Sequence, residues 1–129
     1  MKVLIIDDDA EDTEIFCHAL KDVAPDVNCL VVNNPRTGLT YLANGAESPQ
    51  YIFLDANMCL IDGKECLREL RKIKSLNDTK IIMYSGYINE RQLAEMKKLG
   101  ADHYLNKPNS YEDLRRSLAE LFVNKMIGT

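Results

Sequence analysis

A short apolar run that ends in an acid, Tyr-Ile-Phe-Leu-Asp at positions 51–55, constrains the fold of this chain more than any other feature. An unbroken apolar run of this length is typical of a strand buried on both faces, as in a parallel sheet. Ligands of open α/β sheets bind just beyond the carboxyl ends of the strands. We therefore expect Asp55 to contact a ligand that comes from solvent, while the buried strand holds this residue rigidly. The alternative is that Asp55 only ends the strand, because aspartate is common in loops.

Similar runs recur along the chain and alternate with segments of helical periodicity. The expected strands are residues 2–6, 27–32, 51–54, 80–84 and 101–105. Helical spacing of apolar residues predicts helices that start near residues 9, 35, 63, 89 and 110. Strict alternation implies a parallel sheet with helices on both faces, joined by right-handed crossovers. The predicted fold class is α/β, a doubly wound five-stranded parallel sheet of order 2-1-3-4-5 in three layers.

Composition narrows the class of protein. The 129 residues suit one domain, which we expect to span 1–129 without an output domain. The net charge of −4 gives no basic footprint for nucleic acid. No apolar run approaches the ~20 residues of a membrane span, and the run at 2–6 is too short for a signal peptide. The chain is therefore expected in the cytoplasm, without direct contact to nucleic acid or membrane.

The cysteines at positions 17, 29, 59 and 66 show no metal-type spacing, because there is no Cys-x-x-Cys and neither histidine completes a zinc pattern. In a reducing compartment we expect reduced thiols that act as small apolar residues.

Four of the five expected strands end in polar residues that suit one task. These are Asp7 and Asp8, Asp55, Ser85 and Lys107. In the order 2-1-3-4-5 the first and third strands are neighbours, which brings the three carboxylates together. A cluster of hard oxygens with room for water suits Mg²⁺, and a hydroxyl and an ammonium opposite suit a phosphoryl group. The acids at 7–9 could instead cap a helix, but one acid would be enough for that.

Four motifs carry a family resemblance: IIDDD, LDANMxxxDG, IIMYSG and YLNKP, in this order along the chain. Together they resemble the receiver domain of two-component response regulators, in its stand-alone, CheY-like form. The resemblance implies that Asp55 is the phosphoacceptor, supplied by a sensor histidine kinase or a histidine phosphotransfer protein. It also implies that Asp7 and Asp8 hold Mg²⁺ together with Asp55, with the backbone carbonyl of Asn57 as a further ligand.

The same resemblance gives roles to Ser85, Lys107 and Tyr104. Ser85 would hydrogen-bond a phosphoryl oxygen and Lys107 would pair with it, and the Lys107–Pro108 bond would be the family's cis peptide. Tyr104 would turn inward when the Ser85 hydroxyl moves. The helix at 89–99, the fifth strand and the last helix would then bind a downstream protein.

Two side chains are expected to tune loss of the phosphoryl group. By the family's geometry, Asn57 and Tyr87 flank the path of the attacking water. A tyrosine ring there should exclude water and lengthen the life of the phosphorylated form, unless it points outward into solvent. Cys59 stands where the family usually has proline, so the loop after Asp55 should be less stiff.

Other classes fit the sequence less well. A phosphorylation-independent interaction module with a receiver fold predicts damage to the acids, Ser85 or Lys107, and none is damaged. A phosphatase would need a second acid where Asn57 stands, and an amide is no general acid. A flavodoxin-like protein would bind the phosphate of FMN after the first strand, where the three carboxylates at positions 7–9 would repel it. We therefore expect no enzymatic activity beyond the domain's own phosphorylation and dephosphorylation.

Overall fold

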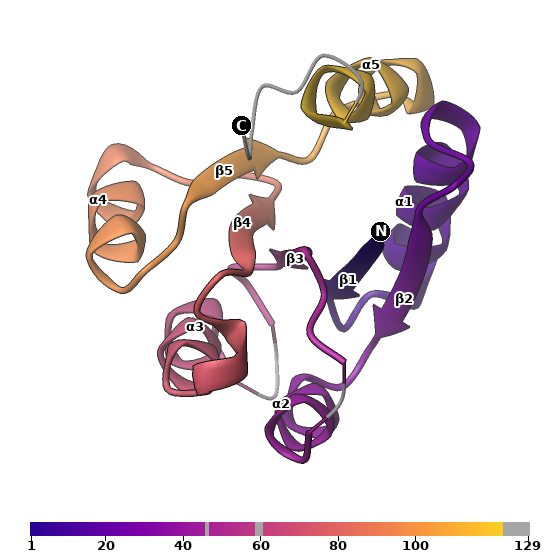
Figure 1. Cartoon of the computed structure of the whole chain (residues 1–129). Helices are drawn as coiled ribbons and strands as arrows, with labels where there is room; N and C mark the ends of the chain where they lie inside the picture. The colour runs from indigo at the N-terminus through magenta and orange to yellow at the C-terminus, as the bar shows by residue number, and fades with distance from the viewer. Residues whose placement is uncertain (46, 59–60, 123–129) are drawn as a thin grey trace.

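A computed structural model of the chain describes residues 1–45, 47–58 and 61–122. It confirms a parallel five-stranded sheet of order β2-β1-β3-β4-β5 with alternating helices (Figure 1). The elements in chain order are β1 (Lys2–Ile6), α1 (Ala10–Val23), β2 (Asn28–Val32), α2 (Pro35–Ala43), β3 (Tyr51–Leu54), α3 (Gly63–Arg71), the 3₁₀ turn η1 (Lys74–Leu76), β4 (Lys80–Ser85), α4 (Glu90–Lys98), β5 (His103–Asn106) and α5 (Tyr111–Phe122). None of the helices in this part of the chain is long and apolar enough to cross a membrane.

Helices cover both faces of the sheet, which gives the three layers (Figure 1). Along β1, Val3 and Ile5 join a core formed with α1 and α5. The alternate residues Leu4 and Ile6 join a second core formed with α2, α3 and α4. All four side chains are at most 1% exposed, because successive residues of a strand point to opposite faces. The unbroken apolar runs of the sequence therefore reflect a sheet that is buried on both sides.

The helices begin with side-chain caps at the predicted places. Asp9 caps α1 by accepting a hydrogen bond from the Asp12 N–H at 3.1 Å. Asn34 caps α2, and Asn89 and Gln92 form a capping box at the start of α4. Because Asp9 serves as the cap, Asp7 and Asp8 remain for another role.

The fifth strand begins two residues later than predicted, at His103. Gly100 has a φ of +110°. The Ala101 N–H donates to the Met96 carbonyl at 3.0 Å. Residues 100 and 101 therefore complete the left-handed end of α4 before the strand can start.

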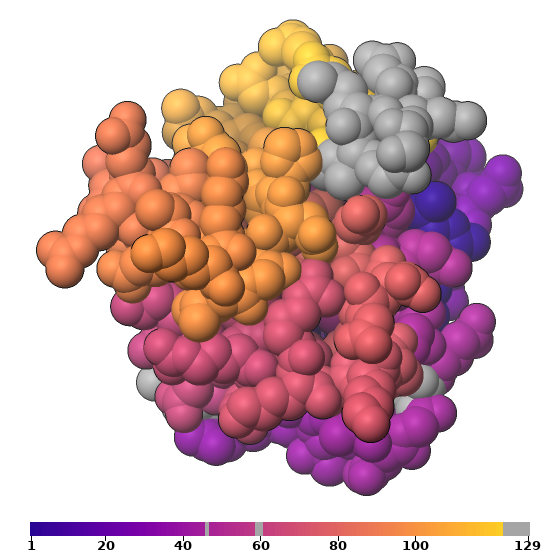
Figure 2. All heavy atoms as spheres, turned by 60° about the vertical axis from the view of Figure 1, so that its left-hand side comes forward, coloured from indigo at the N-terminus to yellow at the C-terminus, as the bar shows by residue number. Residues whose placement is uncertain are grey.

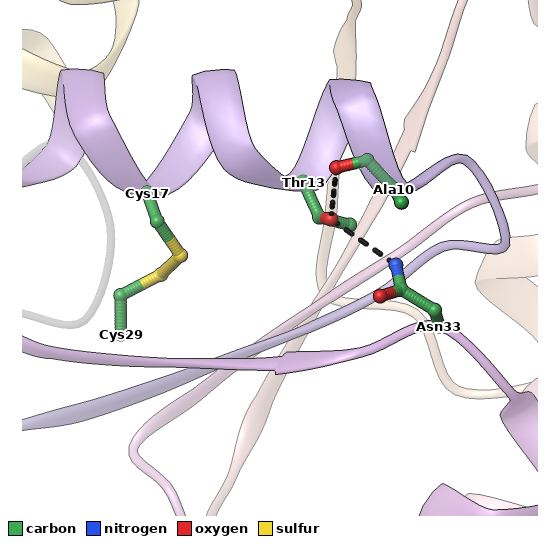
Figure 3. The surroundings of a disulfide bond; sticks show 5 residues. All are labelled: Ala10, Thr13, Cys17, Cys29 and Asn33. Atoms are coloured by element: carbon green, nitrogen blue, oxygen red, sulfur yellow. Dashed lines mark hydrogen bonds between the residues drawn. A yellow bond between two sulfur atoms is a disulfide. The ribbon is translucent and has the colours of Figure 1, made fainter.

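The expectation of four reduced cysteines is wrong for one pair. Cys17 on α1 and Cys29 on β2 form a disulfide, with their Cα atoms 5.8 Å apart (Figure 3). Both residues lie where α1 packs on β2, so a helix-to-strand contact brings them within bonding range. Cys66 is a free buried thiol, and burial raises its pKa to about 12. The effect expected of Cys59 lies outside the described residues.

Candidate functional site

The two central acids extend the hydrogen-bond ladder of the sheet by one residue. The Asp7 N–H donates to the Val32 carbonyl at 3.0 Å, and the Asp55 N–H donates to the Ile6 carbonyl at 3.0 Å. Both side chains therefore leave neighbouring strands at the same edge. One carboxylate oxygen from each of Asp7, Asp8 and Asp55 lies within 4.8 Å of the others. This confirms that the sheet brings the three predicted acids together.

The central carboxylates are largely removed from water. Asp7 is 0% exposed and Asp55 is 5% exposed. Burial raises the pKa of Asp55 to about 6, and the charge of Asp7 adds to this rise. The Asn57 backbone N–H, which donates to Asp55 Oδ1 at 3.1 Å, acts against it, as does the charge of Lys107. Acids held this close are suited to a divalent cation, which relieves their mutual repulsion.

Lys107 lies at the end of β5 and is anchored to β4, because its N–H donates to the Ser85 carbonyl at 2.7 Å. Its Nζ lies 2.8 Å from Asp7 Oδ2, 2.8 Å from Asp12 Oδ2 and 3.7 Å from Asp55 Oδ2. Burial disfavours the charged ammonium, but the hydrogen bonds from Lys107 to Asp12 and Asp7, together with the charge of Asp55, outweigh burial and raise its pKa. The lysine is therefore a fixed cation at the rim of the acidic cluster.

Asp12 was not predicted as a site residue. In the sequence it lies in the first turn of α1, at helical spacing with the apolar residues Ile15 and Phe16. An acid that interrupts an apolar stripe in the first turn of a helix was the signal that could have found it.

Ser85 ends β4, the strand next to β3, and Asn57 lies in the loop that follows Asp55. Ser85 is 1% exposed, and its Oγ accepts a hydrogen bond from Asn57 Nδ2 at 2.9 Å. Asn57 therefore links the hydroxyl of β4 to the loop that holds the Asp55 carboxylate. The use of the Asn57 carbonyl as a metal ligand stays a prediction.

Gly63 fixes that loop where it enters α3. Its N–H donates to the Ala56 carbonyl at 3.1 Å. A Cβ atom at this position would lie 2.7 Å from the Asp55 carbonyl oxygen. Only glycine allows α3 to begin so close to the loop, which explains the glycine of the LDANMxxxDG motif.

The two tyrosines that were expected to act at the site, Tyr104 and Tyr87, both point outward. Tyr104 on β5 is 41% exposed and Tyr87, after β4, is 72% exposed. The inward turn of Tyr104 and the shielding role of Tyr87 stay predictions. The Lys107–Pro108 bond is trans, since no cis peptide occurs in residues 1–45, 47–58 and 61–122. The expected cis bond is therefore wrong, and the trans form is the one that even X–Pro amides favour.

Residues 3–119 match the family described as the response regulator receiver domain. The chain therefore belongs to this family, whose members are signalling modules of two-component systems rather than enzymes.

Solved structures give the same fold. The Mn²⁺-bound response regulator Rcp1 is 21% identical, with a TM-score of 0.82, and the match covers 98% of this chain and 96% of that one. The phosphorylated cyanobacterial phytochrome response regulator RcpA is 22% identical, with a TM-score of 0.83 and the same coverage. The chemotaxis protein CheY4 of Vibrio cholerae is 25% identical, with a TM-score of 0.79, and the match covers 94% of this chain and 98% of that one.

Proposed function

We propose that this receiver domain is a phosphoacceptor and that Asp55 takes a phosphoryl group from a histidine kinase or a histidine phosphotransfer protein. The observation that carries the proposal is the setting of the Asp55 carboxylate. It is buried between two further acids, Asp7 and Asp8, and the Lys107 ammonium, 3.7 Å away. Two acids and a cation around one buried carboxylate suit phosphoryl transfer better than they suit a structural strand end.

The chemistry follows from these side chains. An Asp55 oxygen attacks the phosphorus of a phosphohistidine, a P–O bond forms, the P–N bond breaks, and the imidazole leaves with its electron pair. The transferred group carries negative charge on its equatorial oxygens. Lys107 would pair with one such oxygen, and the Ser85 hydroxyl would donate to another after leaving Asn57.

Mg²⁺ is the metal that we propose for the acidic cluster. Asp7, Asp8 and Asp55 supply hard carboxylate oxygens, and the Asn57 carbonyl would complete the protein ligands. When bound, the ion would offset the charge of both the acids and the phosphoryl oxygens.

We propose that the output surface is made by α4, β5 and α5, which lie side by side in orange and yellow in Figure 2. Ser85 is buried at the end of β4, and Tyr104 stands partly exposed on the neighbouring strand β5. Movement of the Ser85 hydroxyl toward a phosphorylated Asp55 would open space for the Tyr104 ring to turn inward. A downstream protein would bind this altered face. Asn57 would set how fast water removes the phosphoryl group. Tyr87, which is 72% exposed, would slow this loss only by turning inward over the site.

The test is labelling by a small phosphodonor. Incubated with acetyl phosphate and Mg²⁺, the wild-type protein should gain one phosphoryl group by intact-mass measurement, and Asp55→Asn should gain none. Asp26→Asn is the matched control, because Asp26 is an exposed acid before β2, at the opposite end of the sheet. It should label like the wild type, and a chelator should abolish labelling. Equal labelling of Asp55→Asn would refute the proposal, and no labelling of any form would favour a phosphorylation-independent module.

A further inference from the structure

The Lys107 ammonium is shared unequally among three carboxylates. It makes hydrogen bonds of 2.8 Å to Asp7 and to Asp12, but lies 3.7 Å from Asp55. Charge-assisted hydrogen bonds of N–H to carboxylate oxygen are strongest near 2.8 Å. The cation expected to serve the acceptor is therefore bound to two other groups, and one of them, Asp12, has no part in the proposed metal site.

The position of Asp12 is fixed by the start of α1. The Asn33 side chain, just after β2, donates to the Asp7 carbonyl at 2.9 Å and to the Thr13 hydroxyl at 3.1 Å. The Thr13 hydroxyl in turn donates to the Ala10 carbonyl at 2.9 Å, as Figure 3 shows. The first turn of α1 is thus tied to the end of β2 and to the backbone of Asp7. Asp12 lies in this turn, so its carboxylate is held where it meets Lys107.

We propose that Asp12 is a positioning residue that holds the Lys107 ammonium back from Asp55. A phosphoryl group on Asp55 must then draw Lys107 away from Asp12 before the lysine can pair with it. The competition lowers the affinity of the site for a phosphoryl group, because only the difference between the two pairings favours the phosphorylated state. This inference rests on the proposed phosphoacceptor function and adds a residue that limits it.

The test uses beryllofluoride, a phosphoryl mimic, at saturating Mg²⁺, with binding followed by amide NMR. Removal of the competing charge in Asp12→Asn should tighten binding about two- to fivefold, the range expected for a partly exposed ion pair. Asp12→Glu keeps the charge and should return the affinity to that of the wild type. Glu11→Gln is the matched control, since Glu11 is an exposed acid in the same helical turn. It should leave the affinity unchanged.

A double-mutant cycle separates the lysine from a general effect of charge. In a Lys107→Ala background, Asp12→Asn should no longer tighten binding, because there is no ammonium to release. A Lys107→Gln background repeats the measurement if the alanine variant does not fold.

Each outcome decides between the claims. If the wild type binds no beryllofluoride, the phosphoacceptor proposal itself fails. If the wild type binds and Asp12→Asn binds equally or more weakly, the positioning role fails alone. Equal tightening by Glu11→Gln, or tightening that persists without Lys107, would also overturn it, because the effect would then come from net charge.

Discussion

The folded environment of Asp55 favours the protonated form of its carboxyl group. Burial raises its pKa to about 6 from an ordinary value of 3.8. Between these values the folded protein binds the proton more tightly than the unfolded chain does. Stability from this group is therefore fully present below pH 3.8 and is lost as the pH rises through about 6.

At the scale of single residues, the prediction concerns Asp55→Asn, which keeps the shape of the side chain and removes the charge. In metal-free buffer at pH 7.5 the variant should have a free energy of unfolding higher than the wild type by on the order of 1–3 kcal/mol. At pH 4 the two should be nearly equal. Urea unfolding at both pH values measures this difference, with Asp26→Asn as the control that should follow the wild type. A difference that does not change with pH would contradict the account.

At the scale of elements, the Cys17–Cys29 disulfide joins α1 to the edge strand β2. Cys17 and Cys29 are 12 residues apart in sequence, so the bond closes a short loop of the unfolded chain. In the chain-entropy account such a loop is worth about 3 kcal/mol, mainly by restricting the unfolded state. The bond therefore holds α1 on the edge strand independently of the apolar contacts.

The prediction is that the oxidised wild type unfolds with a free energy about 2–3 kcal/mol above that of the double variant Cys17→Ser, Cys29→Ser. A reductant should lower the melting temperature of the wild type and leave that of the double variant unchanged. Intact mass under non-reducing conditions should show the loss of two hydrogens in the wild type alone. Free thiols at both positions in air-oxidised protein would show that the disulfide does not form.

At the scale of the whole molecule, the proposed signal travels from Asp55 to the surface made by α4, β5 and α5. Beryllofluoride should shift amide resonances along that surface, including those of Arg91, Lys97 and Arg115, as well as those around the acidic cluster. Ser85→Ala removes the hydroxyl that starts the route. It should keep the shifts near Asp55 and lose the distant ones. Wild-type shifts confined to the surroundings of Asp55 would refute this route.

The sequence was sufficient to predict a parallel doubly wound sheet, which follows from strict alternation. The order 2-1-3-4-5 is one of the common orders of that fold, and in this order the strand ends bring the acids together. Asp55 could be placed because an apolar run leads directly to it. The contact of Asp12 with Lys107 could not be predicted, because it depends on where the folded chain places the first turn of α1 relative to the residue after β5. The Cys17–Cys29 bond was missed for a similar reason, since a helix and an edge strand must pack before the sulfurs meet. The wrong expectation of a cis Lys107–Pro108 bond came from the family resemblance alone.

Chemical mapping of the modified residue tests the central claim most directly. After labelling with acetyl phosphate and Mg²⁺, borohydride reduces an aspartyl phosphate to the alcohol homoserine, and peptide mass spectrometry then locates it. We predict homoserine at position 55, and none at positions 7, 8 or 12 or in unlabelled protein. Homoserine at any of those other positions, or an unreduced Asp55 in protein that has gained the phosphoryl mass, would contradict the assignment of Asp55 as the phosphoacceptor.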